Sequence, residues 1–362
     1  MQIIKDRRAL HQIPELELEL PKTMAYLKNS LQSLNCQVFS PARSSLCAFF
    51  DFGADHALAF RADCDALPVW EKNDAPYVST HPGQMHACGH DGHMAILLEL
   101  ARRLNQKKTL SHNILLVFQP GEEGLGGARY ICDSGVFEKY HVRAIFGLHL
   151  WPGLEEGKIH TRAGAMMSRA SEITVDVYGK SVHIARAQEG IDALAGGVAF
   201  YRGCIAHAEK LPKETFRVLN FGHMQSGTVR NALSAHTRLE GTMRAYDDET
   251  FRYLQSGLYE IAAQVEKETG CKVSVHCSDG YPAVTNDPTL VEKVEEAVPF
   301  LHLEAPATPS EDFSFYQKRM AGVFFFLGLG GKPALHSDNF NFNEEILGKG
   351  ADFFQELAEK LL

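Results

Sequence analysis

The chain has 362 residues, of which 45% are hydrophobic and 22% charged, a composition typical of globular proteins that excludes wholesale disorder. This length exceeds the size at which a single hydrophobic core usually stops growing, so it predicts two domains, or one core that carries a large insertion. The net charge of −9 argues against a nucleic-acid-binding protein, which needs clustered Lys and Arg to neutralise phosphates.

From the start to about residue 165, helical stretches alternate with short apolar strands. Residues 11–34 show charged and apolar positions at helical spacing, interrupted by Pro21. A helix is expected over 92–104, with Asp91 as its cap, because the apolar positions there recur with the helical period. Another helix is expected over 126–135, and strands over 56–61, 113–118 and 144–150. Continuous apolar strands that alternate with helices indicate an α/β fold with a mostly parallel sheet covered by helices on both faces.

Between about 168 and 280 the pattern changes. Strands are expected over 172–178, 216–221, 234–243 and 272–276, and helices over 191–211 and 248–269. The order strand, helix, strand, strand, helix, strand is that of the split βαβ unit, a ferredoxin-like α+β arrangement. After it, a helix over 289–298, a strand over 322–329 and a helix over 346–362 return to the first pattern. The sequence therefore predicts a discontinuous catalytic domain over 1–167 and 281–362, and an inserted lid domain over 168–280.

The chain shows no signal for a membrane or an oxidising compartment. The longest mostly apolar stretch, 321–331, is shorter than the roughly 20 residues that span a bilayer, and the amino terminus lacks an apolar signal core. The 8 cysteines are scattered and form no CxxC pair, which favours reduced thiols. We therefore expect a cytoplasmic protein without a membrane or nucleic-acid partner.

Side chains that can bind metals follow every strong strand. They are Asp63 and Asp65 after 56–61, Glu122 and Glu123 after 113–118, His149 near the end of 144–150, and His336 shortly after 322–329. The segment MHACGHDGH (85–93) lies between the first of these strands and its helix, and it contains a cysteine and several histidines. Because open parallel sheets bind ligands beyond the carboxyl ends of their strands, we expect these groups to form one site.

Ordinary structural roles explain other groups of the same type. A lone histidine is usually a hydrogen-bonded core or surface group, and we interpret the following in that way: His56, His160, His207, His276 and His302. Two adjacent glutamates are usually solvated, but Glu122 and Glu123 follow an apolar strand and precede a glycine-rich turn that allows close backbone approach. Cys271, His276 and Cys277 are a weaker ligand set, because 272–276 alternates as a strand does.

The donors at the strand ends favour two metal ions. Cys88, His90, Glu123, His149 and His336 supply five side chains, and with a bridging thiolate and a bridging water they complete two four-coordinate ions. Such donors suit Zn²⁺, Mn²⁺, Co²⁺ or Ni²⁺. Next to one donor, Glu122 is expected to act as general base. The carboxylate of Asp65, and as a second candidate that of Asp63, is expected to orient a ligand histidine.

Six motifs resemble, in order and over nearly the whole chain, those of the aminoacylase/hippuricase metallopeptidase family. They are RADCDALP (61–68), MHACGHDGH (85–93), FQPGEEGLGGA (118–128), HLWP (149–152), SEDFSFY (310–316) and LHSDNFNF (335–342). The branch that they resemble contains N-acyl-amino-acid amidohydrolases, N-acetyl-diaminopimelate deacetylase-like proteins and auxin-conjugate hydrolases. The resemblance implies a phosphorylase/hydrolase-like catalytic domain, two divalent ions, Mn²⁺ or Zn²⁺, on the same five donors, and Glu122 as the catalytic glutamate.

The resemblance also assigns roles to the lid domain. It implies a homodimer formed through the lid, a lid histidine, His183, that polarises the scissile carbonyl, and binding of the substrate's carboxylate end by Asn231 and Arg244. An Arg–carboxylate pair suits an amino-acid product. The run SVHIARAQ (181–188) departs from the family's GGHAAxPH-like pattern, since the proline and the second histidine are missing, and the acyl pocket is expected to differ there.

We therefore expect an amidohydrolase acting on non-peptide C–N bonds, which hydrolyses N-acyl-L-amino acids to release the free amino acid. Two alternatives stay open: a dipeptidase, aminopeptidase or carboxypeptidase-type enzyme on the same scaffold, and a non-catalytic amino-acid- or metal-binding protein. A pure binder has no use for the carboxylate of Glu122, which argues against the second. Serine-hydrolase chemistry is not expected, because the chain has no GxSxG nucleophile elbow.

Overall fold

The structure is a computed structural model that describes residues 1–331 and 333–361. Its contacts divide the chain into two compact units, which we call the first unit and the second unit. The first unit is Met1–Met166, Val284–Ala305 and Asp312–Leu362, and the second unit is Met167–Ala283 and Pro306–Glu311. The chain leaves the first unit after Met166 and returns to it at Val284. The short return of 306–311 to the second unit was not expected from the sequence pattern.

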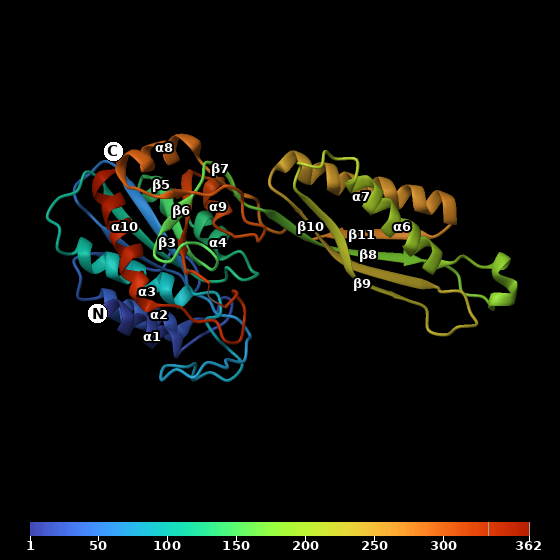
Figure 1. The fold of residues 1–362 in the computed structure, drawn as a ribbon, viewed down its shortest axis with the longest axis horizontal. Coiled ribbons are helices and arrows are strands. Elements are labelled where there is room, and N and C mark those ends of the chain that lie inside the picture. Colours follow the sequence, from blue (N-terminus) through green and yellow to red (C-terminus); the bar gives the residue numbers. More distant parts are fainter. Residues whose placement is uncertain (332, 362) are drawn as a thin grey trace. The chain divides into compact units, whose positions relative to one another are not determined.

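The first unit is built on a mixed sheet in the strand order β1-β2-β4-β3-β5-β14-β6-β13 (Figure 1). Its strands are β1 (Gln37–Phe39), β2 (Leu46–Phe50), β3 (Ala57–Asp63), β4 (Asn113–Gln119), β5 (Val142–Trp151), β6 (Ile159–Thr161), β13 (Leu301–His302) and β14 (Ala321–Gly328). The central strands β4, β3, β5 and β14 are parallel to one another. A separate short pair joins β7 (Gly164–Met167) to β12 (Val284–Asn286). The predicted mostly parallel α/β sheet is confirmed.

Helices cover both faces of this sheet. They are α1 (Gln2–His11), α2 (Pro21–Leu31), α3 (His90–Leu104), α4 (Gly127–Asp133), α5 (Val136–Lys139), α8 (Pro288–Ala297), α9 (Ser314–Gln317) and α10 (Leu347–Lys360), with a 3-10 turn over Glu344–Ile346. The alternation of strand side chains separates two cores. Phe325 of β14 packs into the core that α1, α2, α3, α8 and α10 share, whereas its neighbour Phe324 packs on the other face against Phe313, with ring centroids 4.9 Å apart.

The longest apolar stretch of the sequence is the central strand β14 with the turn that follows it. Its side chains are buried because β14 lies inside the sheet, with the parallel strand β5 on one edge and the antiparallel strand β6 on the other, and helices cover both faces of the sheet. In the part of the chain that the structure describes, no helix has both the length and the apolar character that crossing a bilayer requires.

The predicted helical pattern over residues 11–34 is wrong for residues 12–20, which are not helical. The amino-terminal helix α1 ends at His11, because Pro14 lacks an N–H and disfavours a helical residue before it. A new helix, α2, begins at Pro21, whose fixed φ suits the first helical position. The Glu15 carboxylate accepts hydrogen bonds from the backbone N–H groups of Lys22 (3.1 Å) and Thr23 (2.9 Å) at the start of α2. The proline pattern therefore marks a helix start, not an interruption.

Helix α3 carries the histidine-rich segment, and its start differs from the expected one. The residue at the N-cap is Gly89, which has φ +84°, and no side chain caps the helix there. Asp91 lies inside the first turn and is buried against Arg7 and His11, so the prediction that it caps the helix is wrong. Its negative charge still lies where the helix dipole favours an anion. The first residue of α3 is therefore His90, one of the predicted donors.

The second unit is an antiparallel sheet in the order β11-β8-β10-β9, with two long helices on one face (Figure 1). Its elements are β8 (Arg169–Tyr178), a 3-10 segment (Ile184–Glu189), α6 (Ala193–Ala208), β9 (Arg217–Ser226), β10 (His236–Ala245), α7 (Asp248–Thr269) and β11 (Lys272–Cys277). The predicted split βαβ unit is confirmed, with the first and third strands side by side at the centre of the sheet. Helix α7 has the predicted bounds, and the Asp247 carboxylate accepts from the Thr250 N–H at its start.

Candidate metal centre

The predicted donors meet at one edge of the central sheet. Strand β3 ends at Asp63, β4 ends at Gln119 just before Glu122 and Glu123, and β5 carries His149 near its end. Because these strands are parallel neighbours, their carboxyl ends lie at the same edge. The start of α3 and the loop after β14 bring Cys88, His90 and His336 to the same place.

The five predicted metal ligands form one group of facing donor atoms. Cys88 Sγ lies 3.4 Å from His149 Nε2. Glu123 Oε1 lies 3.5 Å from His336 Nε2 and 3.8 Å from His90 Nε2. Donor atoms of Cys88, Glu123 and His336 all lie within 4.8 Å of one another. The side chains that the sequence assigned to two ions are therefore brought together.

Backbone hydrogen bonds decide which nitrogen of two histidines faces the site. His90 Nδ1 lies 2.8 Å from the carbonyl oxygen of Asp65, and His149 Nδ1 lies 2.8 Å from that of Leu150. A carbonyl oxygen only accepts, so each imidazole carries its proton on Nδ1. In its neutral form each ring then offers the Nε2 lone pair to a cation, which is the arrangement that metal-binding histidines need.

The chemistry of this donor set fits divalent cations. Within the described chain, His90 Nε2 and Glu123 Oε1 are buried and have no hydrogen-bond partner. Unpaired buried polar atoms are costly, and a cation would pair both. Although burial works in the opposite direction, the carboxylates of Asp63, Glu123 and Asp65 raise the pKa of His90 to about 9. The site therefore attracts positive charge.

Asp65 shapes the turn that carries the two glutamates. Its carboxylate accepts hydrogen bonds from the backbone N–H groups of Glu122 (2.9 Å) and Glu123 (3.1 Å), and burial raises its pKa to about 7. The Asp65 carboxylate was expected to orient a ligand histidine, but the group that accepts from His90 Nδ1 is the Asp65 backbone carbonyl, at 2.8 Å, whereas carboxylate Oδ1 lies 3.9 Å from that nitrogen. A Cβ added at Gly127 would lie 1.6 Å from the Pro120 oxygen, so this turn requires the glycine.

Asp63 contacts a histidine to which the sequence pattern gave no role. One oxygen of its carboxylate lies 2.5 Å from His93 Nδ1, and the other lies 2.7 Å from Arg61 Nη1. Burial opposes ionisation, but His90, His93 and Arg61 hold the pKa of Asp63 well below its usual range. The spacing of His90 and His93, one turn apart on α3, was the signal that could have identified this pair.

His183 and Asn231 lie side by side in the second unit. The two chain segments are bridged by hydrogen bonds, including one of 3.0 Å from the Ile184 N–H to the Asn231 carbonyl. The exposed ring of His183 accepts at Nδ1 from the Ala185 N–H, at 3.2 Å. A neutral ring that accepts at Nδ1 carries its proton on Nε2, so His183 presents an N–H donor.

Arg244 lies at the opposite end of β10 from Asn231. Strand β10 begins at His236, after Asn231, and Arg244 is its ninth residue, so about 26 Å of extended chain separates His236 from Arg244. The Arg244 guanidinium donates to the Thr308 carbonyl, at 3.2 Å. One small substrate cannot contact both residues of a single chain, and the prediction that they share one carboxylate is wrong for the isolated chain.

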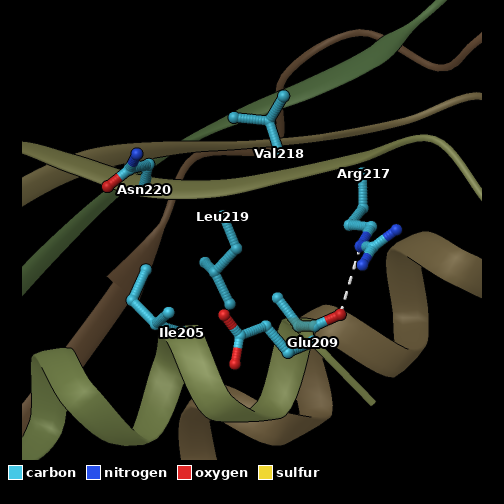
Figure 2. Close-up of a pocket in the computed structure, with 7 residues that line it drawn as sticks. Ile205, Glu209, Arg217, Val218, Leu219 and Asn220 are labelled. Carbon is cyan, nitrogen blue, oxygen red and sulfur yellow. Dashed lines mark hydrogen bonds between the residues drawn. The ribbon is translucent and has the colours of Figure 1, made fainter. Parts of the chain in front are cut away.

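A pocket in the second unit is unrelated to the predicted site. Figure 2 shows it between α6 and β9, with Glu209, Arg217 and Asn220 among its lining residues. Its volume is about 270 Å³. The Arg217 guanidinium donates to three backbone carbonyls, those of Ala208, Pro212 and Thr215. This arginine therefore fixes the chain around the pocket, and no predicted site residue lines it.

Most histidines interpreted as ordinary groups have ordinary contacts. His207 Nε2 lies 3.0 Å from the Tyr253 carbonyl, His302 Nε2 lies 2.8 Å from Glu295, and His276 lies in β11. The buried His160 Nε2 has no partner among the described residues.

Comparisons with known proteins are consistent over the whole chain. Residues 59–360 match the model of peptidase family M20/M25/M40, a span that contains all five donors and Glu122. An uncharacterized hydrolase of Staphylococcus epidermidis is 34% identical, over 97% of this chain and 96% of its own. A structure from methicillin-resistant Staphylococcus aureus has a TM-score of 0.92 at 28% identity, over 98% of this chain and 95% of its own. A dinuclear metal-binding peptidase of the M20 family from Bacillus subtilis has a TM-score of 0.87 at 28% identity, over 99% and 96% of the two chains.

Proposed function

Because the chain belongs to peptidase family M20/M25/M40, we propose that it uses two divalent metal ions to hydrolyse N-acyl-L-amino acids and release the free amino acid. Its family makes it a metal-dependent hydrolase of the peptidase and amidohydrolase class. The observation that carries the two-metal part is the meeting of five donor side chains, two of whose buried atoms, His90 Nε2 and Glu123 Oε1, have no hydrogen-bond partner among the residues that the structure describes.

The residues of the chain have distinct roles in this proposal. Two ions, Mn²⁺ or Zn²⁺, on Cys88, His90, Glu123, His149 and His336 would polarise the scissile carbonyl and lower the pKa of the attacking water. Glu122, whose carboxylate lies within 4.8 Å of donor atoms of His90 and Glu123, takes the proton of that water and passes it to the leaving amine.

The second unit supplies groups for substrate recognition. The Nε2–H of His183 donates to the carbonyl oxygen as negative charge develops on it. Arg244 uses one N–H on a backbone carbonyl, and its remaining donors suit the carboxylate of an amino acid. Asn231, which is bonded to the segment of His183, recognises the amide side of the substrate. Because His183 and Asn231 lie at the opposite end of β10 from Arg244, a given substrate would meet Arg244 of one subunit and the His183 and Asn231 of the other subunit of the homodimer proposed below.

A substrate panel tests the proposal against its rivals. The metal-loaded protein is incubated with N-acetyl amino acids, N-benzoyl amino acids and dipeptides, and the released amino acid is measured. We expect turnover of N-acyl amino acids, with a strong preference over dipeptides. A preference for a free α-amino group next to the cleaved bond would favour the peptidase alternative. Full metal occupancy without turnover of any substrate would favour a binding protein.

We also propose a homodimer formed through the second unit. Helix α6 exposes three apolar side chains at helical spacing, Leu194, Val198 and Tyr201, each more than a third accessible. Strand β9 lies at an edge of its sheet, where backbone groups are available for pairing. Light scattering should give twice the chain mass, and Val198→Glu should shift it towards the monomer. A monomeric wild-type protein would contradict the proposal.

A reducing compartment such as the cytoplasm suits this site. The cysteines are unpaired in the structure, and Cys88 must stay reduced to bind a metal as its thiolate. We propose a cytoplasmic location on this ground, and cell fractionation tests it.

A further inference from the structure

We infer that His93 is a positioning residue: it holds the backbone of Leu150 so that His149 presents Nε2 to the metal centre. The inference deepens the proposed function and rests on it, since His149 must be a metal ligand. His93 lies on α3 three residues after His90, and only 2% of it is exposed. Its ring centroid is 4.5 Å from that of His149.

Hydrogen bonds occupy both nitrogens of the His93 ring. The Leu150 N–H donates to Nε2 at 2.9 Å, so Nε2 carries no proton. The ring proton must then be on Nδ1, which donates to Asp63 Oδ1. Neither nitrogen has a lone pair left for a cation. His93 therefore acts on the metal centre through other residues, although it belongs to the same histidine-rich segment as two donors.

The peptide backbone of Leu150 connects His93 to His149. Its N–H bonds to His93, and its carbonyl accepts the Nδ1 proton of His149, at 2.8 Å. The side chain of Leu150 packs closely against the backbone of α3 at Gly92. The contact is so close that a Cβ added at Gly92 would lie 2.7 Å from Leu150 Cδ1. With the backbone held at the N–H and the side chain packed on α3, the carbonyl that orients His149 has a fixed position.

Asp63 and Arg61 hold the His93 ring on its Nδ1 side, the side away from Leu150. The second oxygen of Asp63 accepts from Arg61 Nη1 at 2.7 Å, and Arg61 Nε donates to Gln119 Oε1 at 2.8 Å. Arg61 and Asp63 are both buried, so the position of the carboxylate is set by strands β3 and β4. This makes the His93 ring a rigid link between the sheet and the end of β5. Partners of this kind tune metal affinity by about 10–100-fold.

Three variants of His93 distinguish the contribution of its hydrogen bond to Leu150 from that of its hydrogen bond to Asp63. Gln places an oxygen near the position of Nε2 and can still accept from the Leu150 N–H. Asn places its amide near Nδ1 and can still donate to Asp63, but it does not reach Leu150. Ala keeps neither bond. Each variant is stripped of metal and titrated with Co²⁺, and calorimetry, the visible absorption of bound Co²⁺ and the unfolding midpoint are measured.

We expect His93→Asn and His93→Ala to lower the affinity for one of the two Co²⁺ ions by about 10–100-fold and to change the absorption spectrum of that bound ion. His93→Gln should stay within a few-fold of the wild type and keep its spectrum. The inference is overturned if all variants bind both ions as the wild type does. It is also overturned if His93→Gln loses as much Co²⁺ affinity as His93→Ala. A third contradicting result is an equal loss of affinity for both ions together with a lower unfolding midpoint, which would indicate that His93 contributes only general packing.

His149→Ala distinguishes this inference from the proposed site. If His149→Ala keeps both ions at wild-type affinity, the proposed ligand set is wrong. If His149→Ala loses one ion while every His93 variant keeps both, only the role of His93 is wrong.

Discussion

Glu122 and Glu123 are identical neighbours in the chain, yet their surroundings give them different chemistry. Glu123 faces His90 and His336, which are ligand-type side chains from other segments. The Asp65 carboxylate bonds to the N–H groups of both glutamates, so their backbone is fixed. The Glu122 carboxylate also lies within 4.8 Å of His90 and Glu123, but only Glu123 is grouped with Cys88 and His336. At this scale, function depends on which of the two carboxylates binds a metal and which accepts a proton, and the matched pair of amide variants tests the assignment.

Glu122→Gln should keep both metal ions and lower kcat by about 10²–10⁴-fold, because the amide cannot accept the proton of the attacking water. Metal content by elemental analysis and turnover of an N-acyl amino acid are measured together. Glu123→Gln is the control, and it should lose metal as well as activity. Wild-type turnover in Glu122→Gln, or full metal content in Glu123→Gln, would reverse the two roles.

Among the elements, helix α1 is held to α3 by buried charges. Arg7 is fully buried, and its Nε lies 2.8 Å from Asp91 Oδ2, while Nη1 lies 3.2 Å from Glu344 Oε1. His11 Nδ1 lies 2.7 Å from the same oxygen of Asp91. Asp91 is the residue that follows the predicted donor His90 in the sequence. The amino-terminal helix therefore supports the first turn of α3, on which two histidines of the metal centre depend.

Arg7→Met should lower the free energy of unfolding by about 3–5 kcal/mol, because it leaves Asp91 buried without its arginine. Arg8→Met is the matched control: Arg8 also contacts Glu344, but its side chain is 45% exposed, so a loss below about 1 kcal/mol is expected. Urea unfolding of both variants measures the difference. Equal losses would show that burial of the Arg7 pair does not decide its contribution.

The pH dependence of stability should report His11. Burial lowers its pKa, but Asp91 and Glu71 outweigh this effect and raise the pKa above its ordinary value. A raised pKa in the folded state stabilises the fold fully below the unfolded value of about 6.5, and this contribution is lost as pH rises through the folded value. The stability difference between wild type and His11→Gln should therefore shrink from pH 6 to pH 9. Urea unfolding at both values tests this, and parallel profiles would contradict it.

In the whole molecule, the metal centre joins segments that are far apart in the sequence. Its donors come from the start of α3, the turn after β4, the end of β5 and the loop of His336, whose φ of +66° is uncommon for a residue other than glycine. Ions that bind the folded chain and not the unfolded one stabilise it by mass action, by about 2.7 kcal/mol at a hundred times Kd.

Removal of metal with EDTA should therefore lower Tm by several degrees, and added Zn²⁺ or Mn²⁺ should restore it. Differential scanning calorimetry measures the shift. Cys88→Ala should respond much less to either treatment, because it lacks the predicted bridging thiolate. A wild-type Tm that is insensitive to both chelator and metal would argue against a metal centre in the folded protein.

The sequence by itself determined the sheet and the split βαβ unit, and it predicted the side chains that the structure brings together as candidate donors. These follow from local periodicity and from the rule that parallel strands end at one edge, and both are readable along the chain. Tertiary structure decided the rest: the helix end at His11, the surroundings of Asp91, the Asp65 carbonyl as partner of His90, and the distance between Asn231 and Arg244. The bond between Leu150 and His93 joins residues 57 positions apart. Such partners come from different segments, and spacing in the sequence does not encode which segments meet.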